Sequence, residues 1–275
     1  MDYKTVLVDL GDDIAREARL EAAALLASAS AGHVVGLTAL GMQIEPYRSV
    51  GQQAGVYEAL YESGRERAVR ADAAAMHAVV GRVAPQVQTS QVILEQEAGS
   101  ALALQGHFAD IVLPAPPTAF ETAPVPMAKA AEYALLHAGR PLLLVPAGGT
   151  RFRLDGRVLI AWDGRREATR AVADALPLLA EAACVTIVVI VKAGRPEEAN
   201  VAGMARWLSA HGISSTVRVE EGEYPADSLL RIADADDSSL LVAGGYGHSR
   251  LGELVMGGTT HALMRHSKIP LLLSH

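Results

Sequence analysis

Cysteine and aromatic residues are scarce in this sequence. It has one cysteine, Cys184, and aromatic side chains make up 4% of its 275 residues. A single cysteine inside an apolar run provides neither a disulfide framework nor a set of thiolate metal ligands. Half of the residues are hydrophobic, so a core must be built mainly from Ala, Val, Leu and Ile. Such residues suit Ala- and Leu-rich helices and buried Val/Ile strands.

Long apolar runs and blocks of positive charge are also missing. No stretch approaches the roughly 18 uninterrupted apolar residues that a membrane span needs. The first residues lack the charged-then-apolar pattern of a signal peptide. The net charge is −7 and no Lys/Arg block stands out, which disfavours a nucleic-acid-binding face. We therefore expect a cytoplasmic protein that binds neither membranes nor nucleic acid.

Short apolar runs alternate with longer helical patterns along the whole chain. Apolar runs of this length, separated by helices, are typical of a parallel sheet covered by helices on both faces. The sequence thus predicts an α/β fold. Strands are expected at 5–10, 33–40, 90–94, 110–115, 141–146, 157–162, 184–191, 215–221, 239–244 and 269–274.

The order of elements in the first half is repeated in the second. The segment 110–115 aligns without a gap over 239–244, and Pro141-Leu142-Leu143-Leu144 aligns over Pro270-Leu271-Leu272-Leu273 at the same offset. Two matches in one register indicate an internal duplication. We therefore predict two five-stranded domains, at 1–146 and 151–275.

A glycine-rich segment at 244–259 follows the expected strand 239–244 and precedes a helix. Ligands of open α/β sheets lie outside the carboxyl ends of the strands, and helix N-termini present free N–H groups to anions. Glycines also let the backbone approach a phosphate closely. Thr259 or Thr260 is expected to cap the following helix. The segment is therefore a candidate phosphate site, although glycines at these positions also suit ordinary tight turns.

The spacing Gly244-x2-Gly247-x9-Gly257 resembles the nucleotide-binding loop of the universal stress protein family, and Asp163 resembles that family's first-strand aspartate. One departure is that Gly258 follows Gly257 where the family has Ser or Thr. The hydroxyl comes one place later. The resemblance implies two tandem Rossmann-like (adenine nucleotide alpha hydrolase-like) domains. It also implies ATP or another adenine nucleotide, with or without Mg, held by Asp163, Ile190, Gly244, Gly247, Gly257, Gly258 and Thr259.

The resemblance further implies a sensing or regulatory role in the stress response. Family members commonly dimerise through their last strands, so 141–145 and 270–274 are expected at an interface, either in a homodimer or in an intrachain pseudo-dimer. Two alternatives stay open. The chain is a tandem scaffold that holds no nucleotide, or it is a slow ATP hydrolase, for which Asp163 is the one obvious candidate group.

The first half lacks the loop glycines. Ala115, Thr118 and Ala128 stand where the second half has Gly244, Gly247 and Gly257, and Gly11 stands at the position of Asp163. We therefore predict one nucleotide per chain. No catalytic set is evident. His261 and His266 lie five residues apart and do not share a helix face, so no metal site is predicted. Extra sequence near 41–60 is interpreted as an extended loop, with a surface flap or a dimer contact as the alternatives.

Overall fold

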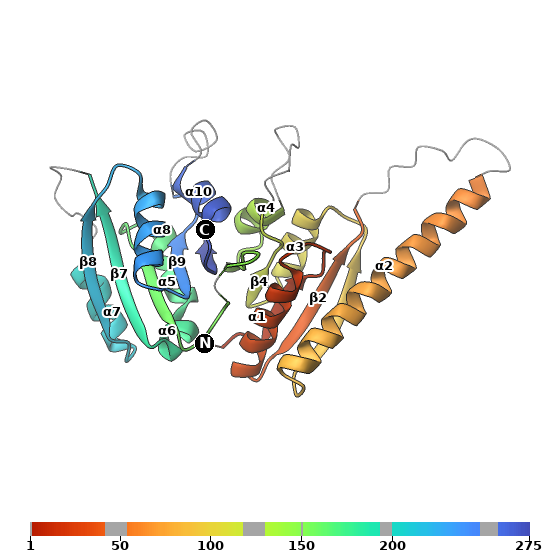
Figure 1. Cartoon of the computed structure of the whole chain (residues 1–275), viewed down its shortest axis with the longest axis horizontal. Coiled ribbons are helices and arrows are strands. Elements are labelled where there is room, and N and C mark those ends of the chain that lie inside the picture. The colour runs from red at the N-terminus through yellow and green to blue at the C-terminus, as the bar shows by residue number, and fades with distance from the viewer. Residues whose placement is uncertain (1, 42–53, 118–129, 150, 193–199, 248–257) are drawn as a thin grey trace.

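Ten strands form a single sheet in the computed structural model (Figure 1). The structure describes residues 2–41, 54–117, 130–149, 151–192, 200–247 and 258–275, with the side chains of 54–61 not described. The strand order is β3-β2-β1-β4-β5-β10-β9-β6-β7-β8. The strands are β1 (Thr5–Asp9), β2 (His33–Ala39), β3 (Gln88–Leu94), β4 (Ile111–Leu113), β5 (Leu142–Leu144), β6 (Arg157–Ala161), β7 (Cys184–Val191), β8 (Ser215–Glu221), β9 (Leu240–Gly244) and β10 (Leu271–Ser274).

Each half contributes five parallel strands with the same internal order, which confirms the predicted fold class and duplication. The register agrees as well, because Val6 lies beside Ile111 in the first half as Val158 lies beside Leu240 in the second. Loop segments predicted at 41–60, 115–130 and 244–259 lie partly outside the described residues.

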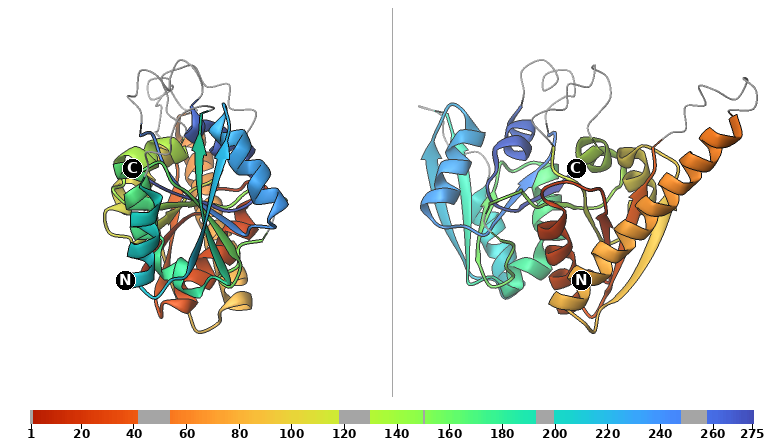
Figure 2. Two further views of the ribbon diagram at one scale, coloured as in Figure 1. Left: turned by 90° about the vertical axis from the view of Figure 1, so that its left-hand side faces the viewer. Right: turned by 45° about the vertical axis from the view of Figure 1, so that its right-hand side comes forward.

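Helices cover both faces of the twisted sheet (Figure 2). One face packs on α1 (Arg16–Ala29), α2 (Ala54–Val83), α5 (Arg166–Asp174), α6 (Leu176–Glu181) and α7 (Val201–Ala210). The other packs on α3 (Ala98–Gly106), α4 (Ala130–His137), α8 (Pro225–Ala235) and α10 (Thr259–His266). None of the helices in the described part of the chain carries an apolar stretch sufficient to cross a lipid bilayer.

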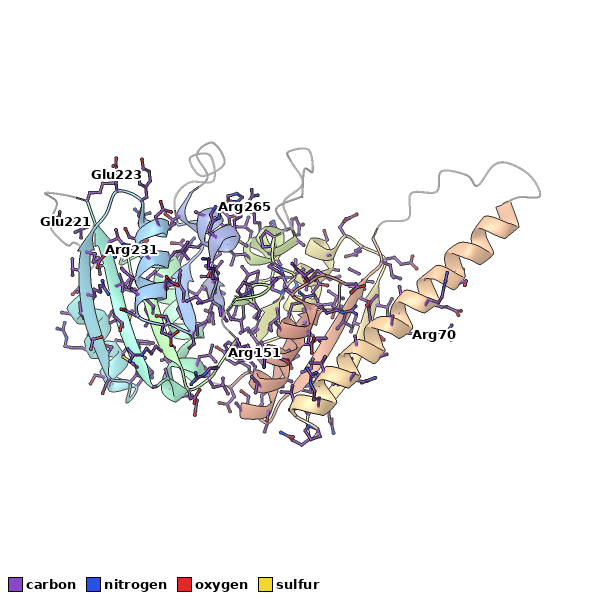
Figure 3. All side chains as sticks on the ribbon, in the orientation of Figure 1. Arg70, Arg151, Glu221, Glu223, Arg231 and Arg265 are labelled. Atoms are coloured by element: carbon purple, nitrogen blue, oxygen red, sulfur yellow. The ribbon has the colours of Figure 1, made fainter. Side chains whose placement is uncertain are left out.

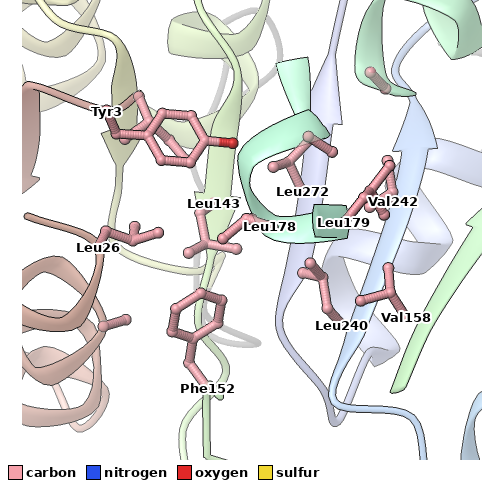
Figure 4. Close-up of a cluster of buried hydrophobic side chains, with 14 of the residues drawn as sticks. Tyr3, Leu26, Leu143, Phe152, Val158, Leu178, Leu179, Leu240, Val242 and Leu272 are labelled. Atoms are coloured by element: carbon pink, nitrogen blue, oxygen red, sulfur yellow. The ribbon is translucent and has the colours of Figure 1, made fainter. Parts of the chain in front are cut away.

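The two halves join through β5 and β10, which pair in antiparallel fashion with Leu143 opposite Leu272. These two leucines are equivalent in the duplication, so an approximate twofold axis passes through the pair. The prediction that 141–145 and 270–274 meet within one chain is confirmed. Both side chains are fully buried, and Figure 4 shows them in a cluster that also contains Tyr3 and Phe152. The domain boundaries at 1–146 and 151–275 stay a prediction.

Polar contacts reinforce this seam away from the paired strands. The Tyr3 hydroxyl donates to the backbone oxygen of Asp174 at 2.6 Å, and burial raises the pKa of the Tyr3 phenol. Within the second half, the Ser274 hydroxyl of β10 in turn holds Asp174, donating to its carboxylate at 2.8 Å. Arg170 donates to the backbone oxygen of Gly139 at 3.0 Å. The N-terminal segment and the turn after α4 of the first half are thus tied to α5 of the second.

The outer edge at β8 is bordered by charged side chains, with Glu221, Glu223 and Arg231 visible around it in Figure 3. Arg218 and Glu220 form an ion pair on this strand. Charges on an edge strand discourage pairing with another chain.

We predict that Leu143→Ala lowers the free energy of unfolding by about 2–5 kcal/mol, because a fully buried leucine leaves a cavity when truncated. Since the cluster around Leu143 draws on both halves, the variant and the parent should each unfold in one cooperative transition. Urea unfolding followed by circular dichroism measures both quantities. Leu104→Ala is the control, because Leu104 is 43% exposed on α3 and should change stability by about 0.5 kcal/mol or less. Two transitions, with only one shifted by Leu143→Ala, would contradict a shared core.

Candidate functional site

A cavity of about 520 Å³ opens at the carboxyl ends of β6, β7 and β9. Strand β6 lies between β7, which follows it in the chain, and β9. The strand order therefore reverses at β6, and the cavity lies at that point. Such switch points are where open α/β sheets bind their ligands. Five residues predicted from the sequence line this one cavity: Asp163, Ile190, Gly244, Gly247 and Thr259.

Asp163 lies at the rim of the cavity, two residues after β6 ends. Its Oδ1 accepts a hydrogen bond from the backbone N–H of Arg165 at 3.0 Å, which closes a tight turn into α5. Gly164 within this turn has φ +75°, a conformation that favours glycine. The Asp163 side chain is still 57% exposed, so its carboxylate has acceptor capacity left for a ligand.

Gly244 brings the end of β9 against the start of α5. A Cβ atom on Gly244 would lie 2.6 Å from the backbone N of Ala168, closer than any side chain tolerates. The structure therefore requires glycine here for packing. A Cβ atom on Gly247 would lie 3.1 Å from Oε2 of Glu167, and Gly247 does not need a positive φ. Gly247 thus lets the backbone pass close to the Glu167 carboxylate rather than relieving backbone strain.

Glu167 is a buried acid in the first turn of α5, 7% exposed, and its carboxylate is beside Gly247. Burial alone would raise the pKa of its carboxyl group. Hydrogen bonds from its own backbone N–H and from Arg166 outweigh burial, so the pKa lies below its ordinary value. Arg166 makes this bond through Nε at 2.9 Å. The Glu167 side chain is therefore ionised at neutral pH and already partnered.

The start of α10 forms another wall of the cavity, through Thr259 and Thr260. The prediction that Thr259 or Thr260 caps this helix is wrong. The N-cap residue is Gly258, which has no side-chain cap, and the Thr260 hydroxyl instead accepts the backbone N–H of Tyr246 at 3.0 Å. This bond ties the segment after β9 to the first turn of α10. Gly257 lies outside the described residues.

Sequence reasoning missed several residues of the cavity. Pro225 and Leu229 at the start of α8 form an apolar wall near Ile190. Lys192, directly after β7, and Arg165 place two cationic side chains on the lining. Lys192 was detectable in principle, because it is the charged residue that ends the apolar strand pattern at the carboxyl edge. In the described segments, no group of three or more His, Cys, Asp or Glu side chains is arranged to hold a metal ion.

At the corresponding strand ends of the first half, the protein's own charged side chains occupy the edge of the sheet. The strand register places Asp9 where the second half has Ala161. Asp9 is 4% exposed, and its carboxylate accepts the backbone N–H groups of Gly11 at 2.9 Å and Ala115 at 3.3 Å. A buried carboxylate at this edge disfavours an anionic ligand.

Arg19 completes the filling of this edge from α1. It is fully buried, and its guanidinium binds the Asp13 carboxylate at 2.8 Å and the backbone oxygens of Asp9 and Gly11 at 2.9 and 3.1 Å. The arginine thus links the end of β1 to the residues of the turn that follows it. The second half keeps a cavity at the equivalent edge.

Residues 195–275 match the model of the Universal stress protein family. The whole chain is similar in structure to a universal stress protein from Archaeoglobus fulgidus DSM 4304, with a TM-score of 0.75 at 14% identity, covering 98% of this chain and 95% of that one. It is also similar to a protein of unknown function from Pseudomonas aeruginosa PAO1, with a TM-score of 0.60 at 17% identity, covering 99% and 92%.

A search of curated protein sequences finds no significant match. The structural similarities span both halves, and the sequence match falls on the half that holds the cavity. Residues 195–275 of the chain therefore match the universal stress protein family, and the chain as a whole shares the fold of a solved universal stress protein.

Proposed function

We propose that the second half binds an adenine nucleotide, ATP or a relative of it, and that binding serves sensing or regulation in the stress response. One observation carries the proposal. Asp163, Ile190, Gly244, Gly247 and Thr259, chosen from the sequence alone, line a single cavity. Its volume of about 520 Å³ falls in the range of small-molecule sites.

The walls of the cavity differ in chemistry in a way that suits the parts of a nucleotide. Ile190, Pro225 and Leu229 supply an apolar region for the base. The exposed Asp163 carboxylate is an acceptor for ribose hydroxyls or base amino groups. The backbone at Gly247 and the first turn of α10 at Thr259 supply N–H groups and the positive end of a helix for phosphates. Gly258 adjoins that turn, and Gly257 stays a sequence prediction.

The charges around the cavity also favour an anion. Lys192 and Arg165 lie on its lining together with one carboxylate, Asp163, which is 3.8 Å from Arg165. Glu167, the buried acid nearby, is bonded to Arg166. The proposal includes one nucleotide per chain, because Asp9, Asp13 and Arg19 fill the equivalent edge of the first half. A magnesium ion is compatible with the proposal only as a companion of the phosphates, because the described residues provide no metal-binding cluster.

We predict that Asp163→Ala weakens ATP and adenosine binding alike, by about tenfold or more, because a hydrogen bond to a charged group contributes roughly 1.5–3 kcal/mol. Isothermal titration calorimetry gives the affinity and the stoichiometry, which should be one nucleotide per parent chain. Asp12→Ala is the matched control, because Asp12 adjoins Gly11, the first-half equivalent of Asp163, and is 87% exposed. Two equal sites per chain, or equal losses in both variants, would contradict a site confined to the second half.

We predict a different pattern for Gly247→Val. The new side chain enters the cavity wall beside Glu167, where the phosphates are proposed to lie, without forcing a strained φ. ATP affinity should fall by about tenfold, equivalent to about 1.4 kcal/mol, and adenosine affinity much less. Gly81→Val is the control, because its side chain would meet open space on α2. If adenosine and ATP lose affinity equally, the phosphates do not lie at Gly247.

A further inference from the structure

A polar pair crosses the seam between the two halves near the start of α10, which borders the cavity. Oε1 of Glu132, on α4 of the first half, lies 2.9 Å from Nδ1 of His261, on α10 of the second. The two helices lie near each other beside the C-terminus (Figure 1). The side chains are 18% and 31% exposed, so both are largely withdrawn from solvent. Neither residue lines the cavity itself.

The pair stands on equivalent positions of the duplication. The sequence offset that relates Leu143 to Leu272 also relates Glu132 to His261, so the pair faces itself across the approximate twofold axis. Two copies of the first half meeting here would oppose two carboxylates. Two copies of the second half would oppose two imidazoles. Only the mixed pair brings together an acid and a base.

A second contact from α4 involves Gly245, in the segment that follows β9. A Cβ atom on Gly245 would lie 2.7 Å from a methyl carbon of Leu135, so α4 packs directly against the Gly245 backbone. A backbone hydrogen bond also fixes Gly245, because its N–H donates to the backbone oxygen of Ser274 at 2.8 Å. The nitrogen Nδ1 of His275 lies 3.0 Å from the Gly245 oxygen.

These contacts converge on residues that line the cavity. Gly245 lies between Gly244 and Tyr246, and Gly244 is in the lining. Tyr246 donates its N–H to Thr260, which is also in the lining and directly precedes His261. Leu135 therefore supports the segment that follows β9, and Glu132 supports the first turn of α10. Both supports come from a single helix of the first half, while the cavity lies in the second.

We propose, on the basis of the proposed nucleotide site, that Glu132 is a positioning residue for that site, acting through His261. The surrounding seam is apolar, with Ala131, Leu135 and Leu144 buried in it. A well-packed apolar pair at 132 and 261 would fit such a seam at least as well, and this partly buried polar pair is better suited to fixing orientation than to adding stability. The first half thereby contributes to ligand binding without touching the ligand.

The test uses the full chain and compares Glu132→Leu, Glu132→Gln and Glu21→Leu. Glu21 is a matched control because it is a partly buried helical acid of the first half, 24% exposed, paired with Arg82 at 2.8 Å far from the seam. Glu132→Gln keeps an oxygen that accepts a hydrogen bond from the His261 ring and should rescue the function. Two readouts are needed, amide hydrogen exchange by NMR without nucleotide and ATP affinity by calorimetry.

In Glu132→Leu, we expect faster exchange at Tyr246 and Ala262, whose N–H groups are bonded to Thr260 and Gly258. We expect ATP affinity to fall about fivefold, within the usual range for coupling between sites. Glu132→Gln and Glu21→Leu should stay within about twofold of the parent. Adding His261→Leu to Glu132→Leu should cause little further loss, because the two residues act through one contact.

The outcomes separate this inference from the proposed function. Unchanged exchange in Glu132→Leu overturns the inference, whether or not the chain binds ATP. Faster exchange with unchanged ATP affinity also overturns it, because the contact then does not serve the site. A parent chain that binds no ATP overturns the proposed function, while faster exchange in that case still supports Glu132 as the residue that positions α10.

Discussion

The pairing of β5 with β10 is the constraint on which the rest of the structure depends. Each is a short apolar strand, and each would otherwise leave an open, hydrophobic edge that requires a partner. Their antiparallel register, with Leu143 opposite Leu272, merges two five-stranded sheets into one and sets the halves in fixed relation. It also brings α4 beside α10, so the same pairing that buries the leucines creates the Glu132–His261 contact.

Once this pairing is made within one chain, the two halves no longer need the same chemistry. At the carboxyl edge of the first half, the Asp9 carboxylate stands where the second half has the small side chain of Ala161. Arg19 is buried beside Asp9 and binds the partly exposed Asp13 carboxylate and the Asp9 backbone oxygen. The buried charges of Asp9 and Arg19 need such partners, and the turn after β1 supplies them. In the second half, two small residues, Ala161 and Gly247, line the cavity.

The fold and much of the cavity could be predicted from the sequence because their signals are local or repeated. Apolar runs of strand length, the gapless alignment of 110–115 with 239–244, and the glycine spacing after 244 all lie along the chain. The Glu132–His261 pair and the buried Arg19 could not be predicted, because a charged residue on a helix looks the same in sequence whether it faces solvent or a distant partner. The same limit explains why the predicted threonine cap of α10 was wrong. The Thr260 hydroxyl accepts the backbone N–H of Tyr246 instead.

The first half then has a physical role even though charged side chains occupy its edge equivalent to the cavity. Covalent linkage keeps the edge of β5 at a high effective concentration next to β10, so the second half always has its edge covered. The surface of the first half at this seam differs chemically from the surface of the second half that it contacts. Glu132 faces His261, and Leu135 faces Gly245. A symmetric pair of identical halves cannot place an acid on one side of its axis and a base on the other. Duplication within one chain permits this difference, and the difference lies next to the residues that border the cavity.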